Sequence, residues 1–262
     1  MTDSDWLHIV EGPGPIVATA VHTGHGLRPG VAELMALPEA DRLREEDPYS
    51  ALWTEAFDTR LVPAQSRFEV DLNRPRDGAV YRTPKDAWGL DMWARPMSDE
   101  MVAGSLARYD RFYEEMCRIL DEKQRQHGRF VVLDLHTYNH RRDGQDGPAG
   151  EKAGNPEVNV GTGSLDRERW GGLVDRFMAD VAGFDFLGRT LDVRENVRFQ
   201  GGYLSRWVHE NYPVSGCCLA IELKKFFMDE WTGQVYDAEH KAIARTLAET
   251  SAGLLESLAG LG

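Results

Sequence analysis

The stretch Arg129-Phe-Val-Val-Leu-Asp-Leu-His136 decides how this chain folds. Its apolar run has no polar face, so the strand that it predicts must be covered on both sides. In open α/β sheets, the chemistry lies beyond the carboxyl ends of such strands. His136 stands at that end, two residues after Asp134, where an imidazole can bind a metal and a carboxylate can orient it. The alternative is a histidine that makes structural hydrogen bonds at a strand end.

Buried strands and amphipathic helices alternate along the rest of the chain. Strands are predicted at residues 14–21, 68–72, 190–193 and 218–223. Helices are predicted at residues 32–46, 98–127, 173–182 and 238–259. Ser98 is the expected N-cap of the second helix, whose length suggests a break. Residues 141–156 predict a surface loop, and residues 147–163 are too irregular to assign. The alternation indicates a three-layer α/β fold, in which helices cover both faces of a mixed, mostly parallel sheet.

The composition is that of a globular protein with a marked acidic balance. Of the 262 residues, 42% are hydrophobic and 28% charged, which is ordinary, and no repeat or long linker divides the chain. We therefore expect a single domain, 1–262. The formal charge of −13 argues against nucleic acid or an anionic membrane as a partner. A small anionic substrate remains compatible, because a few arginines can outweigh the global field locally.

Targeting signals and cysteine usage favour the cytoplasm. No apolar run approaches the ~20 residues that cross a bilayer, and the acidic N-terminus lacks the basic region of a secretory signal. The cysteines are Cys117, Cys217 and Cys218, an odd number with one vicinal pair, which is a poor disulfide framework. Reduced, buried thiols are expected at Cys217 and Cys218, and the oligomeric state is left open.

Two histidines and an acidic cluster form a candidate metal site. His22 follows the strand at 14–21, as His136 follows its own strand. The cluster Arg44-Glu-Glu-Asp-Pro48 supplies carboxylates between them. Two histidines and one carboxylate, with an open position for water, make a catalytic zinc set. For the acidic cluster, the alternative is a solvated helix end.

Glu222 is a carboxylate inside an apolar strand. Burial is costly for such a group unless it is paired or protonated, so Glu222 is a candidate general base with a raised pKa. The alternative is a salt bridge to Lys224, Lys225 or an arginine. Because side chains alternate along a strand, Lys224 rather than Lys225 is expected to share the face of Glu222.

Basic residues offer anion contacts at several positions. Arg67 and the pair Asn73-Arg74 lie near the predicted strand at 68–72, and an arginine beside an asparagine suits bidentate carboxylate recognition. Arg67 could instead polarise a carbonyl. Three further arginines are read as ordinary solvated side chains: Arg82, Arg198 and Arg206.

Taken together and in this order, these residues resemble the N-formylglutamate amidohydrolase family, part of the wider zinc-carboxypeptidase-like group. The matching blocks span residues 16–230, and their combination is more specific than any one of them. They are His22-Thr23-Gly24, Ser66-Arg67, Asp71-Leu72-Asn73-Arg74-Pro75, Asp134-Leu135-His136-Thr137, Asn196 with Gly201-Gly202-Tyr203, and Ile221-Glu222.

The resemblance implies a carboxypeptidase-like fold and one zinc ion. The ligands would be His22, His136 and an acidic residue, which falls on Asp47 with Glu46 as its rival. The wider group uses His-x-x-Glu, but His25 stands where that glutamate would be, which breaks the pattern.

The resemblance also implies the reaction and its residues. Glu222 would act as general base and acid, Arg67 would contact the carbonyl, and Asn73 with Arg74 would clamp the α-carboxylate. The activity implied is hydrolysis of the amide of an N-acyl amino acid such as N-formylglutamate, a carbon–nitrogen bond other than a peptide bond. Residues 138–142 and 224–231 are more elaborate than is usual in the family and favour a subgroup with another substrate. Competing interpretations are a zinc carboxypeptidase or amidase on peptide-like substrates, and a non-catalytic carboxylate-binding protein of the same fold.

Overall fold

The computed structural model describes residues 6–261, and a seven-stranded mixed sheet forms their centre. The strand order is β1-β3-β2-β4-β7-β5-β6. The strands are β1 Leu7–Val10, β2 Ile16–Thr19, β3 Thr59–Pro63, β4 Phe130–Tyr138, β5 Val158–Gly161, β6 Val193–Glu195 and β7 Gly216–Lys224. Only the pairs β1–β3 and β5–β7 are antiparallel. The predicted mixed, mostly parallel sheet is therefore confirmed.

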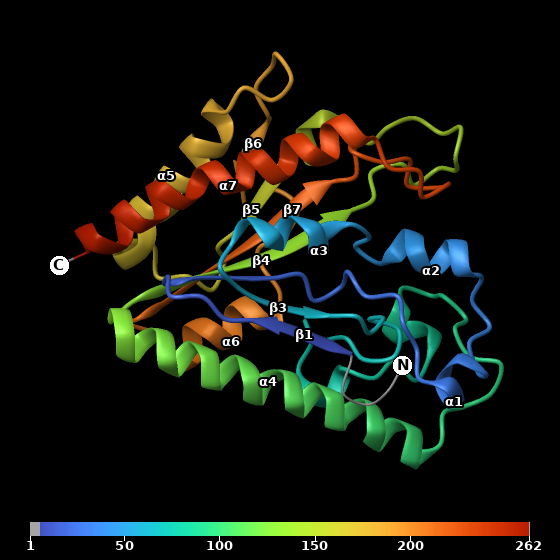
Figure 1. The fold of residues 1–262 in the computed structure, drawn as a ribbon. Coiled ribbons are helices and arrows are strands. Elements are labelled where there is room, and N and C mark those ends of the chain that lie inside the picture. The colour runs from blue at the N-terminus through green and yellow to red at the C-terminus, as the bar shows by residue number, and fades with distance from the viewer. Residues whose placement is uncertain (1–5, 262) are drawn as a thin grey trace.

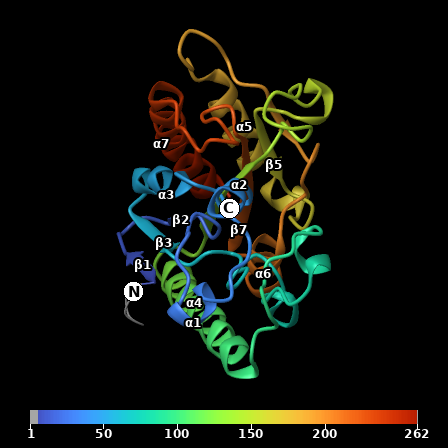
Figure 2. The same cartoon turned by 90° about the vertical axis from the view of Figure 1, so that its right-hand side faces the viewer.

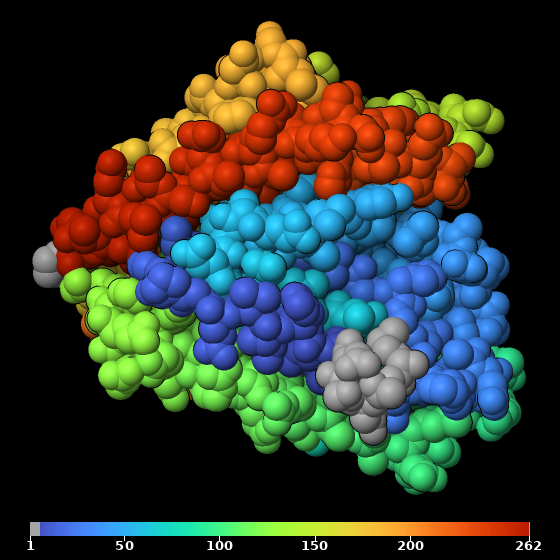
Figure 3. Space-filling view, viewed as in Figure 1, coloured from blue at the N-terminus to red at the C-terminus, as the bar shows by residue number. Residues whose placement is uncertain are grey.

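Helices cover both faces of this sheet, so the fold has three layers (Figure 1). On one face lie α4 Asp99–His127 and α6 Tyr203–Asn211, and on the other lie α3 Ser50–Trp53, α5 Arg167–Gly183 and α7 Asp237–Gly260. Shorter helices are α1 Pro29–Ala32 and α2 Glu39–Glu45, with 3-10 turns η1 Thr54–Ala56, η2 Arg76–Gly78, η3 Pro84–Ala87 and η4 Lys152–Gly154. In Figure 3, α7 runs across the surface as a ridge above the N-terminal segments. None of the described helices combines the length and hydropathy that a membrane span requires.

The central strand β4 shows why both layers are needed. All nine of its residues are buried. Val131, Leu133 and Leu135 enter the core beneath α5 and α7, whereas Phe130 and Val132 enter the core above α4 and α6. Because side chains alternate along a strand, an unbroken apolar run supplies both cores at once.

The longest helix, α4, begins and ends where its sequence signals stand. The Ser98 hydroxyl accepts the amide of Met101, two acidic residues occupy the first turn, and Gly128 ends the helix with a φ of 74°. The expected break is wrong, since the helix runs for 29 residues without interruption. Its apolar side chains stay on one face and pack against the sheet along much of this length.

Three other predicted elements differ in the structure. Residues 68–72 form turns rather than a strand, because the Asp71 amide donates to the Ala79 carbonyl and its side chain binds the next turn. The helix predicted at 32–46 is split, since Pro38 precedes α2 and lacks an amide to continue a helix. The short strand predicted at 190–193 overlaps β6 only at Val193, and β5 falls within a stretch that the sequence left unassigned.

The parallel strands β2, β4 and β7 all end at the same edge of the sheet (Figures 1 and 2). Figure 2 looks onto this edge, where the connecting loops gather around the ends of the strands. Within the β4–β7 pair, His136 lies directly opposite Glu222. The fold therefore brings the chemical groups at three strand ends to one place.

Candidate active site

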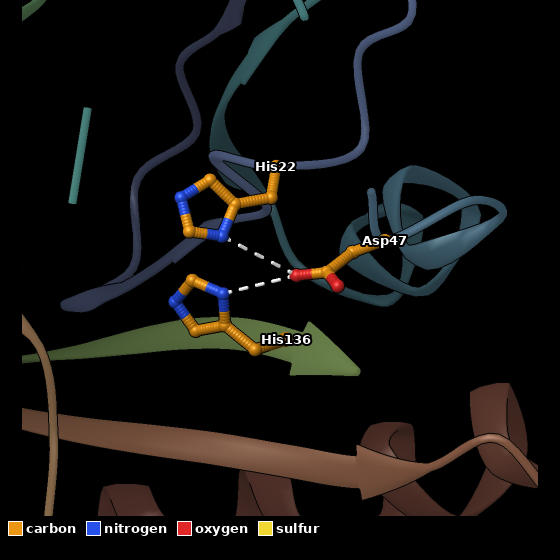
Figure 4. A group of neighbouring side chains, drawn as sticks. All are labelled: His22, Asp47 and His136. Atoms are coloured by element: carbon orange, nitrogen blue, oxygen red, sulfur yellow. Dashed lines mark hydrogen bonds and ion pairs between the residues drawn. The ribbon is translucent and has the colours of Figure 1, made fainter. Parts of the chain in front are cut away.

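Three buried side chains meet at the carboxyl edge: His22, Asp47 and His136 (Figure 4). Their exposed fractions are 4%, 3% and 2%. The Nδ1 atoms of His22 and His136 lie 3.5 and 3.1 Å from the same oxygen, Asp47 Oδ2. One ligand atom from each residue lies within 4.8 Å of the others, so the three could hold a single metal ion.

Backbone contacts fix where these three groups stand. His22 lies three residues past β2, in a turn closed by the Thr23 amide and the Ala20 carbonyl. The Asp47 amide donates to the His22 carbonyl at 2.9 Å, which ties the loop after α2 to the end of β2. His136 projects from β4 itself. The site is therefore built on two strand ends and one tethered loop.

Two further carboxylates contact the outer nitrogens of the two histidines. Asp71 Oδ1 lies 2.7 Å from His22 Nε2, and Asp134 Oδ2 lies 2.9 Å from His136 Nε2. The Asp134 contact is an ion pair rather than an aligned hydrogen bond. Carboxylates that hold the outer nitrogen orient a histidine so that its other nitrogen can bind a metal. The predicted partnership of Asp134 with His136 is confirmed.

The electrostatics of the site suit a bound cation. Burial acts to raise the pKa of Asp47, but hydrogen bonds from His136 and His22 outweigh it and hold that pKa well below its ordinary value. Burial acts to lower the pKa of His136, yet the charge of Asp134 and contacts with Asp134 and Asp47 raise it well above the usual range. The carboxylates thus stabilise positive charge between the rings, and two nitrogens with one oxygen are a donor set that zinc accepts.

Glu46 faces away from this centre. Its carboxylate contacts His25 Nδ1 at 2.5 Å and accepts the Ser66 hydroxyl. His25 is also reached by the Arg42 guanidinium, so it belongs to the same supporting network. Of the two acidic residues that the sequence left open, Asp47 is the one that points at both histidines, and the assignment of Glu46 as a ligand is corrected.

Glu222 lies beside the candidate metal ligands, and its carboxylate forms no ion pair with another of residues 6–261. Burial raises its pKa to about 7; the charge of His136 opposes that rise, and the charges of Asp47 and Asp134 add to it. The alternative of a lysine salt bridge is not observed. Lys225 donates to the carbonyls of Arg44 and Glu46.

Lys224 lies two residues after Glu222 in β7, as predicted, but Lys225 is the lysine that reaches the cavity. Lys225 lines the same cavity as Glu222, whereas Lys224 turns to the Asn155 carbonyl. The strand ends at Lys224, so the alternation of faces does not constrain Lys225.

A cavity of about 490 Å³ opens over these residues, and Arg67 and Arg74 line it. Arg67 donates to Asp71 Oδ2 at 3.0 Å and lies 4.9 Å from the ring centre of Trp88. Arg74 rests over Tyr81 at 4.4 Å and keeps 3.6 Å from Asp71 Oδ2. Both predicted arginines therefore reach the cavity. Arg67 donates hydrogen bonds within the protein, whereas Arg74 makes a longer ion pair.

Asn73 also lines the cavity, but both ends of its amide are used inside the protein. Its Oδ1 accepts the Leu204 amide at 2.8 Å, and its Nδ2 lies 3.1 Å from His136 Nε2. These contacts favour a role for Asn73 in positioning His136.

Several residues that support the site had no predicted role. Asp71 stood inside a quoted motif without a role, and Thr137 followed His136 without one. Tyr81 donates to Asp71, and Trp88 is presented to the cavity by a left-handed backbone with φ of 53°. No local spacing signals these contacts, because each joins segments that meet only in the folded chain.

Thr137 is expected to set the strength of metal binding. Its hydroxyl donates to Asp47 Oδ1 at 2.9 Å, which leaves Oδ2 directed at the histidines. Thr137→Val should weaken zinc binding by about 10- to 100-fold, measured by competition with a chelator, and Thr137→Ser should restore it. Thr250→Val is the matched control, since that buried hydroxyl binds the Leu247 carbonyl in α7. Unchanged affinity in Thr137→Val would remove this role.

A buried two-histidine, one-carboxylate set beside a carboxyl group of raised pKa is typical of metal-dependent hydrolases. The family model for N-formylglutamate amidohydrolase matches residues 14–228. The chain belongs to the N-formylglutamate amidohydrolase family, as the sequence motifs predicted. No match was found among curated proteins.

Two solved structures share this fold, and a third gives a lower score. The N-formylglutamate amidohydrolase from Ralstonia eutropha JMP134 superposes with a TM-score of 0.76 at 16% identity, covering 96% of this chain and 97% of its own. A gene product from Agrobacterium tumefaciens gives 0.66 at 19% identity, covering 97% and 96%. A metallo-carboxypeptidase from Burkholderia cenocepacia gives 0.39 at 14% identity, covering 94% of this chain and 58% of its own.

Proposed function

We propose that this protein is a metal-dependent amidohydrolase that cleaves the amide of a small N-acyl amino acid, with N-formylglutamate as the first candidate. One observation carries the proposal: Glu222, whose pKa is raised to about 7, lies opposite His136 and shares a cavity with the His22–Asp47–His136 set. A proton-transfer group thus stands next to the donors of a metal site. Family membership supports the same reaction class.

His22, Asp47 and His136 would hold one zinc ion. A zinc ion supplies Lewis-acid chemistry, which makes water a nucleophile near neutral pH and polarises a carbonyl. The donor set fits this ion because it offers two imidazole nitrogens and one carboxylate oxygen, all buried, with their outer sides already bound.

Glu222 moves the protons of the reaction. Its ionised carboxylate takes a proton from the attacking water as the new carbon–oxygen bond forms. The protonated carboxyl then gives that proton to the leaving nitrogen as the carbon–nitrogen bond breaks. The products are a carboxylic acid and the free amino acid. A pKa near neutrality serves both steps, because the group must be base and acid in turn.

Arg67 and Arg74 bind and orient the substrate. Arg67 is fixed by Asp71 and by the Glu45 carbonyl, so its guanidinium can face the substrate carbonyl and stabilise developing negative charge. Arg74 is 30% exposed in its side chain and can pair with the α-carboxylate. Holding the carboxylate places the scissile bond against Glu222.

Activity is expected to fall on the acid side of neutrality. Glu222 must be ionised to act as a base, so kcat/KM should drop tenfold per pH unit below its pKa. That pKa is about 7 without a metal, and a nearby cation lowers the pKa of a carboxyl, so the midpoint should lie between 4.5 and 7. A pH–rate profile of kcat/KM measures it. A rate that is constant from pH 4.5 to 7.5 would contradict the assignment.

The size of the cavity favours a small substrate over a peptide. About 490 Å³ lies within the range of ordinary small-molecule sites. The test is a panel of N-formyl and longer N-acyl amino acids beside peptides with a free C-terminus, each with and without chelator. Chelator-sensitive hydrolysis of the N-acyl amino acids supports the proposal, and preference for peptides would favour a carboxypeptidase.

A further inference from the structure

Lys225 is a buried cation that the proposed reaction does not use. Its side chain lines the same cavity as Glu222, and the residue is only 2% exposed. Its ammonium forms no ion pair with a carboxylate among residues 6–261. Burying an ammonium costs free energy unless other groups replace the water around it. The groups that Lys225 binds instead of water therefore indicate its role.

The Nζ atom of Lys225 donates to two backbone carbonyls at the end of α2. It lies 2.6 Å from the Arg44 carbonyl oxygen and 2.8 Å from the Glu46 carbonyl oxygen. The last carbonyls of a helix lack partners within it, and a cation there also interacts favourably with the helix dipole. Glu46 is extended, with a ψ of 176°, so its carbonyl points away from the helix ladder. Lys225 supplies the donor that this carbonyl needs.

The Glu46 carbonyl belongs to the peptide bond that carries Asp47. The N–H of the same peptide bond donates to the His22 carbonyl at 2.9 Å. Because a peptide bond is planar and rigid, holding its oxygen and its nitrogen fixes the whole unit, including the Cα atom of Asp47. The Asp47 side chain leaves this clamped unit and reaches the rings of His22 and His136 (Figure 4).

The backbone of Lys225 is itself tied to the strand that carries His136. Lys225 follows the last residue of β7, and its amide donates at 3.0 Å to the carbonyl of Tyr138, the last residue of β4. The strands β4 and β7 are paired in parallel up to this point. Lys225 therefore connects the sheet on which His136 stands with the loop that carries Asp47.

The charge of Lys225 leaves one donor over. Burial lowers its pKa to about 8, the charges of Asp47, Glu45 and Glu230 oppose that fall, and the charge of Arg44 adds to it. The side chain is thus mostly protonated at neutral pH and has three N–H donors, two of which meet the carbonyls. A contact of the third donor with substrate is the alternative that an experiment must separate.

We propose that Lys225 is a positioning residue, which holds the peptide unit before Asp47 and thereby directs the Asp47 carboxylate at the two histidines. The inference rests on the proposed function, because it takes Asp47 as a metal ligand. The role differs from that of Thr137, whose hydroxyl binds the carboxylate itself. Metal affinity should therefore depend on Lys225, and the dependence should act through Asp47.

Lys225→Met removes every donor and keeps much of the length of the side chain. Zinc affinity, measured by competition with a chelator, should fall about 10- to 100-fold, as for other residues that orient a metal ligand. Lys225→Arg keeps the charge and several N–H donors, so it should recover part of that loss. The visible absorption spectrum of the cobalt-loaded protein should also change in Lys225→Met, because it depends on the geometry of the ligands.

A double-mutant cycle tests whether Lys225 acts through Asp47. In Asp47→Asn the carboxylate is already absent, so adding Lys225→Met should lower the remaining zinc affinity by less than about twofold. An equal loss of affinity in the wild-type and Asp47→Asn backgrounds would mean that Lys225 acts on another part of the site, and the positioning role would be overturned.

Lys123→Met is the matched control. Lys123 is also buried, at 4% exposed, and its ammonium donates to the Gly12 carbonyl from α4, outside the cavity. This variant should lower the melting temperature of the metal-free protein and leave zinc affinity unchanged. The same result in Lys225→Met would make Lys225 a merely structural residue. Unchanged zinc affinity with a raised KM would make it a substrate contact, which also overturns the proposal.

The wild-type protein separates this inference from the proposed function. If it binds zinc but hydrolyses no N-acyl amino acid, the proposed function fails, and a loss of zinc affinity in Lys225→Met still supports the positioning role. If it hydrolyses them and Lys225→Met keeps its zinc affinity, only the positioning role fails. A wild-type protein that binds no zinc overturns both.

Discussion

Glu222→Gln is expected to lower turnover by about 10²- to 10⁴-fold while bound metal stays unchanged. The amide has nearly the same shape as the carboxylate but accepts no proton at neutral pH. Glu222 lies outside the His22–Asp47–His136 donor set, so zinc content should equal that of the wild type. The measurement is kcat together with metal analysis of the same preparation.

The control for this variant is Glu195→Gln. Glu195 lies in β6, accepts the Thr162 hydroxyl and does not line the cavity. The variant makes the same chemical change on β6, two strands away from β7 in the sheet, and should keep full turnover. Wild-type activity in Glu222→Gln would remove the residue from the mechanism, and loss of metal along with activity would show that it acts through the metal site instead.

Asp47→Asn is expected to lose tightly bound metal and hydrolysis together. Asp47 is the oxygen donor between two histidines, and its replacement removes the charge that balances a cation there. The loss of affinity should exceed the about 10- to 100-fold that a supporting residue contributes. Chelator competition measures the affinity, and added zinc at high concentration should restore part of the activity.

Glu46→Gln is the comparison variant for Asp47→Asn. The two acidic residues are adjacent, yet Glu46 contacts His25 and Ser66. Its replacement should leave zinc stoichiometry unchanged, with an affinity loss smaller than that of Asp47→Asn. Full zinc affinity in Asp47→Asn combined with metal loss in Glu46→Gln would reverse the assignment of the third ligand.

Much of the fold could be predicted because its strands are so apolar. The runs that end near His22 and His136, and the run that contains Glu222, are parallel neighbours in the sheet. Parallel strands bring the groups at their carboxyl ends to one edge. Three polar residues in apolar segments were therefore enough to locate the candidate site. Their side chains do converge there, as the cavity that they share shows.

The remaining features depend on contacts between distant segments. Asp71 meets His22 across 49 residues, and Thr137 meets Asp47 across 90. The backbone conformation determines which of Glu46 and Asp47 points at the histidines. The chain leaves α2 at Glu46 in an extended conformation. All five residues of 68–72 are buried, although they form turns. A short run of buried residues is compatible with a strand and also with a turn that side chains hold in place.

The decisive experiment is hydrolysis of N-formylglutamate by the wild-type protein after it has been stripped of metal and then titrated with zinc. We expect the stripped protein to be inactive, and we expect activity to return in proportion to zinc and to reach its plateau at one equivalent per chain. Full activity in the metal-free protein would contradict a metal-dependent amidohydrolase. Failure to bind zinc at all would leave a carboxylate-binding protein that keeps the fold without the reaction.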